Sequence, residues 1–320
     1  MSLEKHNLRS ETSVRNEGPF TKETVQIDWS TGIEMTTWWE HLGQLRFYGD
    51  IARIELLESI VSKLSGQEVH LTTNNQQNNL ILPNLKGKTI VDIGCGQGKL
   101  SIPLAHLGAQ IFGIDNNPEM IKKARQNKLE LPKGDDNIYN RQVYMKHDVC
   151  DLKNVLGDGV ADAIISAGVA IFISSDKIEA FISEQARILK SGGYLAMSTT
   201  NYELAKSDCP PKLGTAKIAD LTELENIEVS HEIDGEPEKY TVQNIEEKYH
   251  HSIIPASESQ SFNLYLYPNQ LFIDLGHKYS LKLMSIEDVP VTQEYLNLSS
   301  NWQSEATGYS YNTLFYFQKI

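Results

Sequence analysis

The chain has 320 residues, 40 % of them hydrophobic and 8 % aromatic, which suits a globular protein with a sizeable core. Its 29 basic and 42 acidic residues give a formal charge of −13, and this charge disfavours nucleic acid as a partner. No stretch is apolar for long enough to predict a membrane span, and the polar first residues match neither a secretion signal nor a transit peptide.

The three cysteines, Cys95, Cys150 and Cys209, lie far apart and follow no metal-binding spacing. We therefore predict no metal site. The cysteines are expected to be reduced thiols in a cytoplasmic protein.

Patterning along the chain predicts five regions. They are a mobile N-terminus (1–20), an N-terminal helical cap with a linker (21–83), an α/β core (84–202), a lid insertion (203–267) and a C-terminal part of the core (268–320). Within the cap, apolar residues recur at helical spacing from Ile51 to Leu64, which predicts an amphipathic helix.

Residues 88–200 alternate short apolar runs with helical patterns. The predicted strands are TIVDIG, QIFGID, VYMKHD, ADAIISAG and YLAMST, and the helices are LSIPLAHLG, PEMIKKARQNKL and DKIEAFISEQARILK. This alternation predicts a parallel sheet with right-handed crossovers. Further on, the predicted elements are a hairpin around Asp234–Gly235, a helix in NQLFIDLGHKY and two final strands.

Residues 91–98 read VDIGCGQG, a strand that ends in glycines and leads into a helix. This arrangement holds a nucleoside at the carboxyl edge of a parallel sheet, where a Cβ would collide with the ligand or strain the backbone. Dinucleotide-binding proteins also carry a glycine loop, but its spacing is G-x-G-x-x-G and its helix faces a pyrophosphate. Here the spacing is G-x-G-x-G. The carboxylate of Asp92 would repel a pyrophosphate and attract a cationic amino-acid group.

This motif resembles the D/E-x-G-x-G-x-G signature of class I S-adenosylmethionine-dependent methyltransferases, especially the ubiquinone- and menaquinone-biosynthesis branch. The resemblance covers residues 88–200 and extends more loosely through the C-terminal helix and strands. It implies a Rossmann-like seven-stranded α/β sheet with an antiparallel last strand, to which this chain adds the N-terminal helical segment and an α+β lid. It also implies S-adenosyl-L-methionine as cofactor and a small molecule as methyl acceptor.

The resemblance assigns cofactor-binding roles to the glycine loop and to three strand ends. The residues are Asp92, Gly94, Cys95, Gly96 and Gly98 in the loop, Asp115 with Asn116 at the ribose, Asp148 and Val149 at the adenine, and Ser166 and Ala167 at the methionine end. Simpler interpretations stay open. Asp92 can brace the loop amides, Asp115 can be an ordinary strand-end acid, and Asp148 can be a helix cap. Cys95 is interpreted as a small buried residue rather than a nucleophile.

Methyl transfer requires donor and acceptor to be held in line and away from water, so a base is optional. Many relatives carry a Glu-His or His-His pair after the fourth strand, but this chain has Ala170 and Ile171 there. The remaining catalytic candidates are His250 and His251, which can equally be a solvated pair, whereas His106 and His277 are expected to be packing or surface residues. Trp38, Trp39 and Tyr48 are lid candidates that either cover the ligands or pack the N-terminal helix onto the core.

Residues 220–250 contain ten acids and two lysines, which predicts a solvated face or a surface that steers a cationic amine. Two other functions remain as alternatives: an NAD(P)-dependent oxidoreductase and a non-catalytic module that binds S-adenosylmethionine. The acceptor atom (oxygen, nitrogen or carbon) and the oligomeric state stay open.

Overall fold

The computed structural model describes residues 48–67, 69, 83–129, 138–200, 226–233, 236–246, 250–254, 264–290 and 310–320. Its helices are α2 (Tyr48–Ser65), α3 (Ser101–His106), α4 (Pro118–Leu129), the 3-10 helix η2 (Ala170–Phe172), α5 (Ile178–Ile188) and α7 (Asn269–Lys278). Its strands are β1 (Thr89–Ile93), β2 (Gln110–Asp115), β3 (Gln142–Lys146), β4 (Ala161–Ala167), β5 (Leu189–Thr200), β6 (Asn226–Ile233), β7 (Glu236–Glu246), β8 (His250–Ile254), β9 (Leu264–Leu266), β10 (Leu281–Pro290) and β11 (Ser310–Lys319).

Seven strands form the large sheet, in the order β10-β11-β5-β4-β1-β2-β3. Strands β1 to β5 pair in parallel, whereas β11 runs antiparallel to both β5 and β10. The predicted Rossmann-like sheet with an antiparallel last strand is therefore confirmed. The strand order reverses between β1 and β4, and open α/β sheets bind ligands beside the carboxyl ends of the strands at such a switch point.

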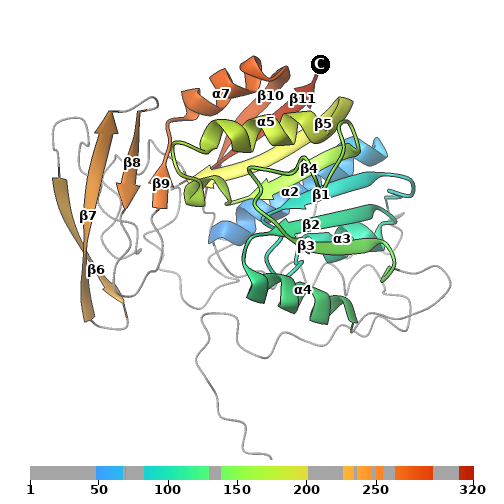
Figure 1. The fold of residues 1–320 in the computed structure, drawn as a ribbon, viewed down its shortest axis with the longest axis horizontal. Coiled ribbons are helices and arrows are strands. Elements are labelled where there is room, and N and C mark those ends of the chain that lie inside the picture. The colour runs from blue at the N-terminus through green and yellow to red at the C-terminus, as the bar shows by residue number, and fades with distance from the viewer. Residues whose placement is uncertain are drawn as a thin grey trace, which may run out of the picture.

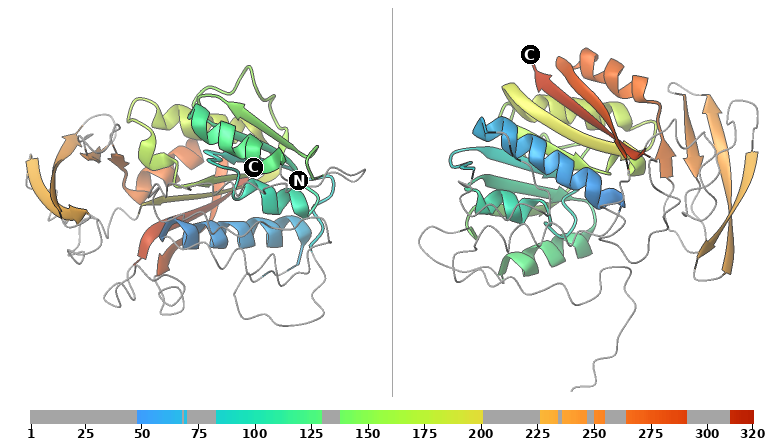
Figure 2. Two further views of the ribbon diagram at one scale, coloured as in Figure 1. Left: turned by 90° about the horizontal axis from the view of Figure 1, so that it is seen from below. Right: turned by 180° about the vertical axis from the view of Figure 1, so that it is seen from behind.

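Side chains alternate between the two faces of this sheet. Tyr194 and Ala196 of β5 pack in a core with α2 and α3, whereas Leu195 and Met197 pack in a second core with α5 and α7. Figure 2 shows α2 lying across one face of the sheet, with α5 on the other. Because both faces are covered by helices, the central strands β1 and β4 are almost wholly buried, as parallel strands usually are.

Helix α2 confirms the predicted amphipathic pattern. Leu56, Leu57, Ile60 and Val61 are at most 1 % exposed and lie against the sheet. The described part of the N-terminal region therefore packs on one face of the large sheet and forms part of the hydrophobic core. Residues 1–47, which include Trp38 and Trp39, lie outside the described residues.

Helix α5 ends earlier than its sequence pattern predicts. The pattern continues to Lys190, but the carbonyls of Arg187 and Ile188 accept hydrogen bonds from the amides of Gly159 and Val160. Leu189 then pairs with Ala161 as the first residue of β5. Backbone pairing with a distant segment thus stops a helix that local preference would extend.

A second, antiparallel sheet has the order β6-β7-β8-β9, and the β6–β7 pair confirms the predicted hairpin. In Figure 1 this small sheet lies beyond the carboxyl ends of the parallel strands. The Tyr267 hydroxyl, just after β9, donates a 2.7 Å hydrogen bond to the carbonyl of Ile173, just after η2. This bond attaches the small sheet to the edge where the glycine loop lies.

None of the helices in the described part of the chain is long and apolar enough to cross a membrane.

We predict that Leu57→Ala lowers the free energy of unfolding by about 2–5 kcal/mol, because it leaves a cavity between α2 and the sheet. The control is Ile320→Ala, at a residue that is 71 % exposed, which should change stability by at most about 0.5 kcal/mol. Denaturant unfolding measures both. Equal midpoints for the two variants would contradict the packing of α2 as described.

Candidate functional site

Three glycines shape the loop that follows β1. Gly94, Gly96 and Gly98 have φ angles of +68°, +53° and +80°, which lie in the left-handed region that disfavours residues with a Cβ. The loop therefore turns sharply at the carboxyl end of β1 before α3 begins. The sequence pattern identified these positions, and the structure supplies the backbone reason.

The three glycines differ in what surrounds them. A Cβ on Gly94 would lie 2.3 Å from Val169 Cγ2, and one on Gly98 would lie 2.5 Å from Tyr144 Oη. A Cβ on Gly96 would meet no atom within 4 Å among the described residues. Gly94 and Gly98 are thus required by packing, whereas Gly96 borders open space at the switch point.

The Asp115 carboxylate, at the end of β2, fixes the middle of this loop. Its Oδ2 accepts a 2.9 Å hydrogen bond from the Gly96 amide, and its Oδ1 accepts a 2.8 Å bond from the Asn117 amide. Asn116 is exposed beside it, and Asn117 caps α4 through bonds to the Glu119 and Met120 amides. Asp115 is therefore a half-buried carboxylate held at the edge of the open space beside Gly96.

The Asp92 carboxylate lies beneath the loop and is only 2 % exposed. Its Oδ2 accepts a 2.6 Å hydrogen bond from the hydroxyl of Ser101, the first residue of α3. Nearby, the buried Tyr144 hydroxyl donates to Gln142 Oε1 at 2.7 Å. Asp92 thus braces the junction of loop and helix through the Ser101 side chain, whereas the sequence analysis considered contacts with the loop amides. Sequence reasoning missed Ser101 and Tyr144, because neither belongs to the glycine motif.

Cys95 is buried in the loop, with 7 % of its surface exposed. Burial raises the pKa of its thiol well above the ordinary value, and the carboxylates of Asp92 and Asp115 raise it further. The thiol stays protonated at neutral pH, so it is a packing group rather than a nucleophile.

The end of β4 brings a second polar group to the same edge. Ser166 pairs with Ile93, next to the glycine loop, and is 1 % exposed. Its hydroxyl has no hydrogen-bond partner among the described residues. Ala167 is half-buried, and Gly168 has a φ of +67°, where a Cβ would meet no described atom within 4 Å. A buried hydroxyl of this kind is usually satisfied by a ligand or water.

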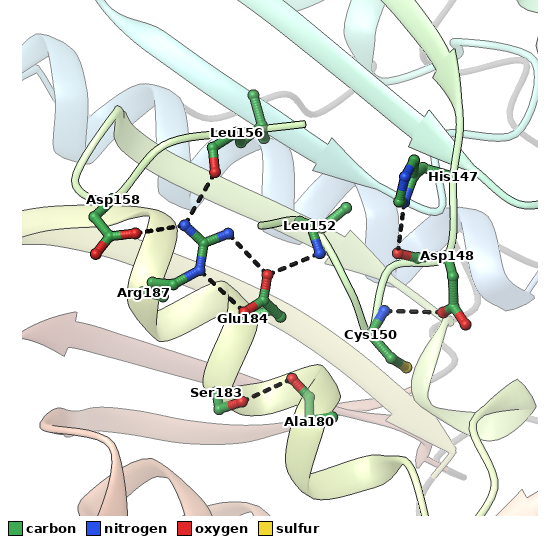
Figure 3. Close-up of polar contacts among 10 residues, drawn as sticks. All are labelled: His147, Asp148, Cys150, Leu152, Leu156, Asp158, Ala180, Ser183, Glu184 and Arg187. Atoms are coloured by element: carbon green, nitrogen blue, oxygen red, sulfur yellow. Dashed lines mark hydrogen bonds and ion pairs between the residues drawn. The ribbon is translucent and has the colours of Figure 1, made fainter. Parts of the chain in front are cut away.

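Asp148 follows β3 and has two side-chain partners, of which Cys150 is drawn in Figure 3. Its Oδ1 accepts a 3.0 Å hydrogen bond from the Cys150 amide, and its Oδ2 lies 2.9 Å from the Lys177 ammonium. Partial burial opposes ionisation, but these two hydrogen bonds outweigh it and hold the pKa of Asp148 below its ordinary value. Val149 is buried in the core with α5. The ion pair with Lys177 was not foreseen from the sequence.

A charged cluster fixes the connector between β3 and β4 on α5 (Figure 3). Glu184 accepts a 2.8 Å hydrogen bond from the Leu152 amide and two bonds from Arg187. Arg187 also donates to the Leu156 carbonyl and to Asp158. The connector that carries Asp148 is thereby held in place.

Residues 91–197 match a family model described as "Methyltransferase domain". The match begins inside β1 and ends inside β5, so it contains the glycine loop and the ends of β2, β3 and β4. This segment is a methyltransferase domain.

Two curated relatives are similar to the chain over part of its length. Over 119 residues it is 36 % identical to the mitochondrial ubiquinone biosynthesis O-methyltransferase of Rattus norvegicus, covering 37 % of this chain and 32 % of the relative. Over 106 residues it is 35 % identical to the magnesium-protoporphyrin O-methyltransferase of Synechocystis, covering 33 % of this chain and 42 % of the relative. The chain thus spans about a third of the rat protein's length.

A solved structure from Listeria monocytogenes, described as a candidate S-adenosylmethionine-dependent methyltransferase, shares the fold. Its TM-score is 0.50 at 14 % identity, and the match covers 83 % of this chain and 99 % of that one.

The 3-10 helix η2 follows the carboxyl end of β4, close to the glycine loop, and its residues are apolar. Ala170 is buried, Ile171 is half-buried, and Phe172 is 52 % exposed. Tyr265 stacks with Tyr267 beside η2, at a ring-centroid distance of 6.4 Å. The described surface formed by η2 and these two tyrosines is therefore apolar and aromatic.

Only some of the histidines and aromatic residues predicted from the sequence have side chains within the described residues. His250 and His251 pair with Glu246 and Ile245 in the small sheet, but their side chains lie outside the described residues, as does that of Tyr48. In the methyltransferase domain, burial and then Arg141 lower the pKa of His106 to about 4, so it is neutral at pH 7. His277 is exposed on α7. The described residues contain no group of three or more potential metal ligands.

We predict that Glu184→Gln lowers the free energy of unfolding by about 1–3 kcal/mol at pH 7, because a buried charge-assisted network is lost. Burial raises the pKa of Glu184, but the Arg187 and Leu152 hydrogen bonds lower it more, to below 4.5. The contribution of this carboxylate is therefore complete above pH 4.5 and is lost as the pH falls through the folded-state value.

The difference between wild type and Glu184→Gln should accordingly shrink in acid, as denaturant unfolding over a pH series would show. Asp158→Asn is the matched control. It removes the outer partner of Arg187, an aspartate whose side chain is 81 % exposed, and should cost no more than about 1 kcal/mol. A gap between wild type and Glu184→Gln that stays constant down to acid pH would refute this role of Glu184.

Proposed function

We propose that the chain is a class I S-adenosylmethionine-dependent methyltransferase that acts on a small-molecule acceptor. The observation that carries this proposal is the open space at Gly96, bordered by the Asp115 carboxylate. The buried Ser166 hydroxyl at the same edge, which has no partner among the described residues, supports a polar ligand there.

The charges at this edge favour the same ligand. Asp92 and Asp115 are carboxylates, Asp148 is paired with Lys177, and Cys95 adds no positive charge. Such a surface repels the pyrophosphate of a dinucleotide and attracts the sulfonium and ammonium groups of S-adenosylmethionine. When bound, this cofactor supplies an activated methyl group.

The proposal assigns each residue a part in binding. Asp115, with Asn116, would receive the ribose hydroxyls, and Asp148 and Val149 would contact the adenine. Ser166 and Ala167 would line the methionine end, together with the glycine loop. The Asp148–Lys177 pair is exposed, so its rearrangement would cost little, since exposed ion pairs contribute about 0–1 kcal/mol.

The acceptor atom is not assigned by these observations. The two relatives are O-methyltransferases by name, which favours an oxygen acceptor, but they align over only about a third of this chain. The apolar wall of η2 supports an acceptor that needs no base from this element. We also propose that the protein is cytoplasmic, as expected from the sequence.

The first test of this function is ligand preference. Calorimetry should detect binding of S-adenosylhomocysteine and none of NAD. Asp115→Ala should weaken binding of the homocysteine nucleoside about tenfold to hundredfold, because a charge-assisted hydrogen bond is worth about 1.5–3 kcal/mol.

Two variants sharpen this test. Gly96→Ala should keep the fold, apart from left-handed strain of about 1–2 kcal/mol, yet lose the nucleoside, because its methyl group enters the open space. Asp158→Asn removes an acid far from the loop and should bind as wild type. Binding of NAD alone, or full affinity in a folded Asp115→Ala, would overturn the proposed function.

We propose further that residues 203–267 form a lid over the acceptor. The strands β6, β7 and β8 pair only with one another and with β9 in the described structure, so they add nothing to the large sheet. The Tyr267–Ile173 hydrogen bond attaches this unit at the open edge. A segment in this position can shape the acceptor pocket and exclude water.

Replacing residues 212–255 with a short Gly-Ser linker should leave S-adenosylhomocysteine affinity nearly intact and abolish turnover. The variant keeps β9 and Tyr267, so the attachment at Ile173 is preserved. A Gly-Ser replacement of residues 74–79 controls for the presence of such a linker elsewhere in the chain. Calorimetry, circular dichroism and a methyl-transfer assay over phenol, catechol and amine acceptors give the readout. Full turnover in a folded variant would show that the segment is not a lid.

A further inference from the structure

A cavity lies at the amino-terminal ends of the parallel strands, at the other end of the large sheet from the glycine loop. Its volume is about 240 Å³. It is lined by Lys63 of α2, Lys88 just before β1, Asp162 in β4, and the first residues of β5 from Lys190 to Tyr194. Apart from Lys63, these residues precede or begin the strands β1, β4 and β5, and the proposed cofactor site lies at the carboxyl end of the same sheet.

The charge of this cavity has the opposite sign to that of the chain. Three lysines and one aspartate give its lining a net charge of +2, whereas the whole chain carries −13. A concentration of positive charge in an acidic protein is a local feature that the overall composition does not explain.

Two contacts hold lysines at the cavity. Asp162 Oδ2 accepts a 2.8 Å hydrogen bond from the Thr89 amide and lies 2.7 Å from the Lys190 ammonium. The Lys63 ammonium lies 4.4 Å from the centroid of the buried Tyr194 ring, a cation–π contact that keeps it near the cavity wall. Asp162 also attracts the Lys88 ammonium, so a single carboxylate faces three ammonium groups and the lining keeps its net positive charge.

The backbone of β5 opens toward this cavity. Ala161 and Ala163 of β4 pair with Leu189 and Tyr194, so the four residues between them bulge out of the sheet. Gly192 in this bulge has a φ of +77°, and a Cβ there would meet no atom within 4 Å. The bulge therefore leaves open space beside the lysines.

We propose that this cavity binds a small phosphorylated anion. The volume is below the 300–1,000 Å³ of pockets for drug-sized ligands, and it suits a phosphate or pyrophosphate group. Lysine ammonium groups bind phosphate as point charges, and two of them match a dianion. A single cavity in a chain of charge −13 does not suit the extended backbone of a nucleic acid.

The test is calorimetry of the full chain with inorganic pyrophosphate at constant ionic strength. Wild type should bind in the millimolar range or tighter. Lys63→Gln and Lys88→Gln should each weaken binding about fivefold, and the double variant roughly twentyfold, because each removes one partly screened charge. Lys122→Gln removes an exposed lysine of α4 and should bind as wild type.

The two sites can be separated by the same method. The double variant should keep its S-adenosylhomocysteine affinity, and Gly96→Ala should keep its pyrophosphate affinity. If S-adenosylhomocysteine did not bind, the proposed function would be wrong, but the pyrophosphate experiment would still test the second site. Absence of pyrophosphate binding at millimolar concentration, equal binding by wild type and a folded double variant, or a stronger preference for an oligonucleotide would each overturn the proposal.

Discussion

The hydrogen bond from the Gly96 amide to Asp115 Oδ2 ties the loop after β1 to the end of β2. It forms only if the loop bends back through left-handed angles, and those angles require the glycines. The same carboxylate holds the Asn117 amide, which starts α4. One side chain thus sets the loop, the strand end and the next helix. A ligand that approaches Gly96 meets groups already fixed in place, which reduces the ordering that binding requires.

The sequence predicted the parts of the fold that depend on local pattern. The glycine spacing, the alternation of strands and helices and the β6–β7 hairpin all follow from near neighbours along the chain. The end of α5 was wrong by two residues, because its carbonyls bond to Gly159 and Val160, which lie far from it in sequence. Long-range backbone pairing of this kind leaves no trace in a helical pattern.

The site shows the same division. The glycines were predicted from their spacing and Asp115 from the family resemblance, but the sequence could not tell which glycine borders open space and which ones are closed by Val169 and Tyr144. Nor could it predict the Lys177 partner of Asp148, because the two residues meet only when α5 packs on the sheet. The acceptor-side residues His250, His251, Trp38 and Trp39 stay predictions, since their side chains lie outside the described residues.

The position of β11 has a consequence for synthesis. This strand comes last in the sequence but lies between β5 and β10 in the sheet. Until residues 310–319 have left the ribosome, β5 and β10 each present an open edge to other chains. The pairings of β11 with β5 and β10 are therefore the latest of these to form, and the nascent protein is exposed to aggregation until β11 is synthesised.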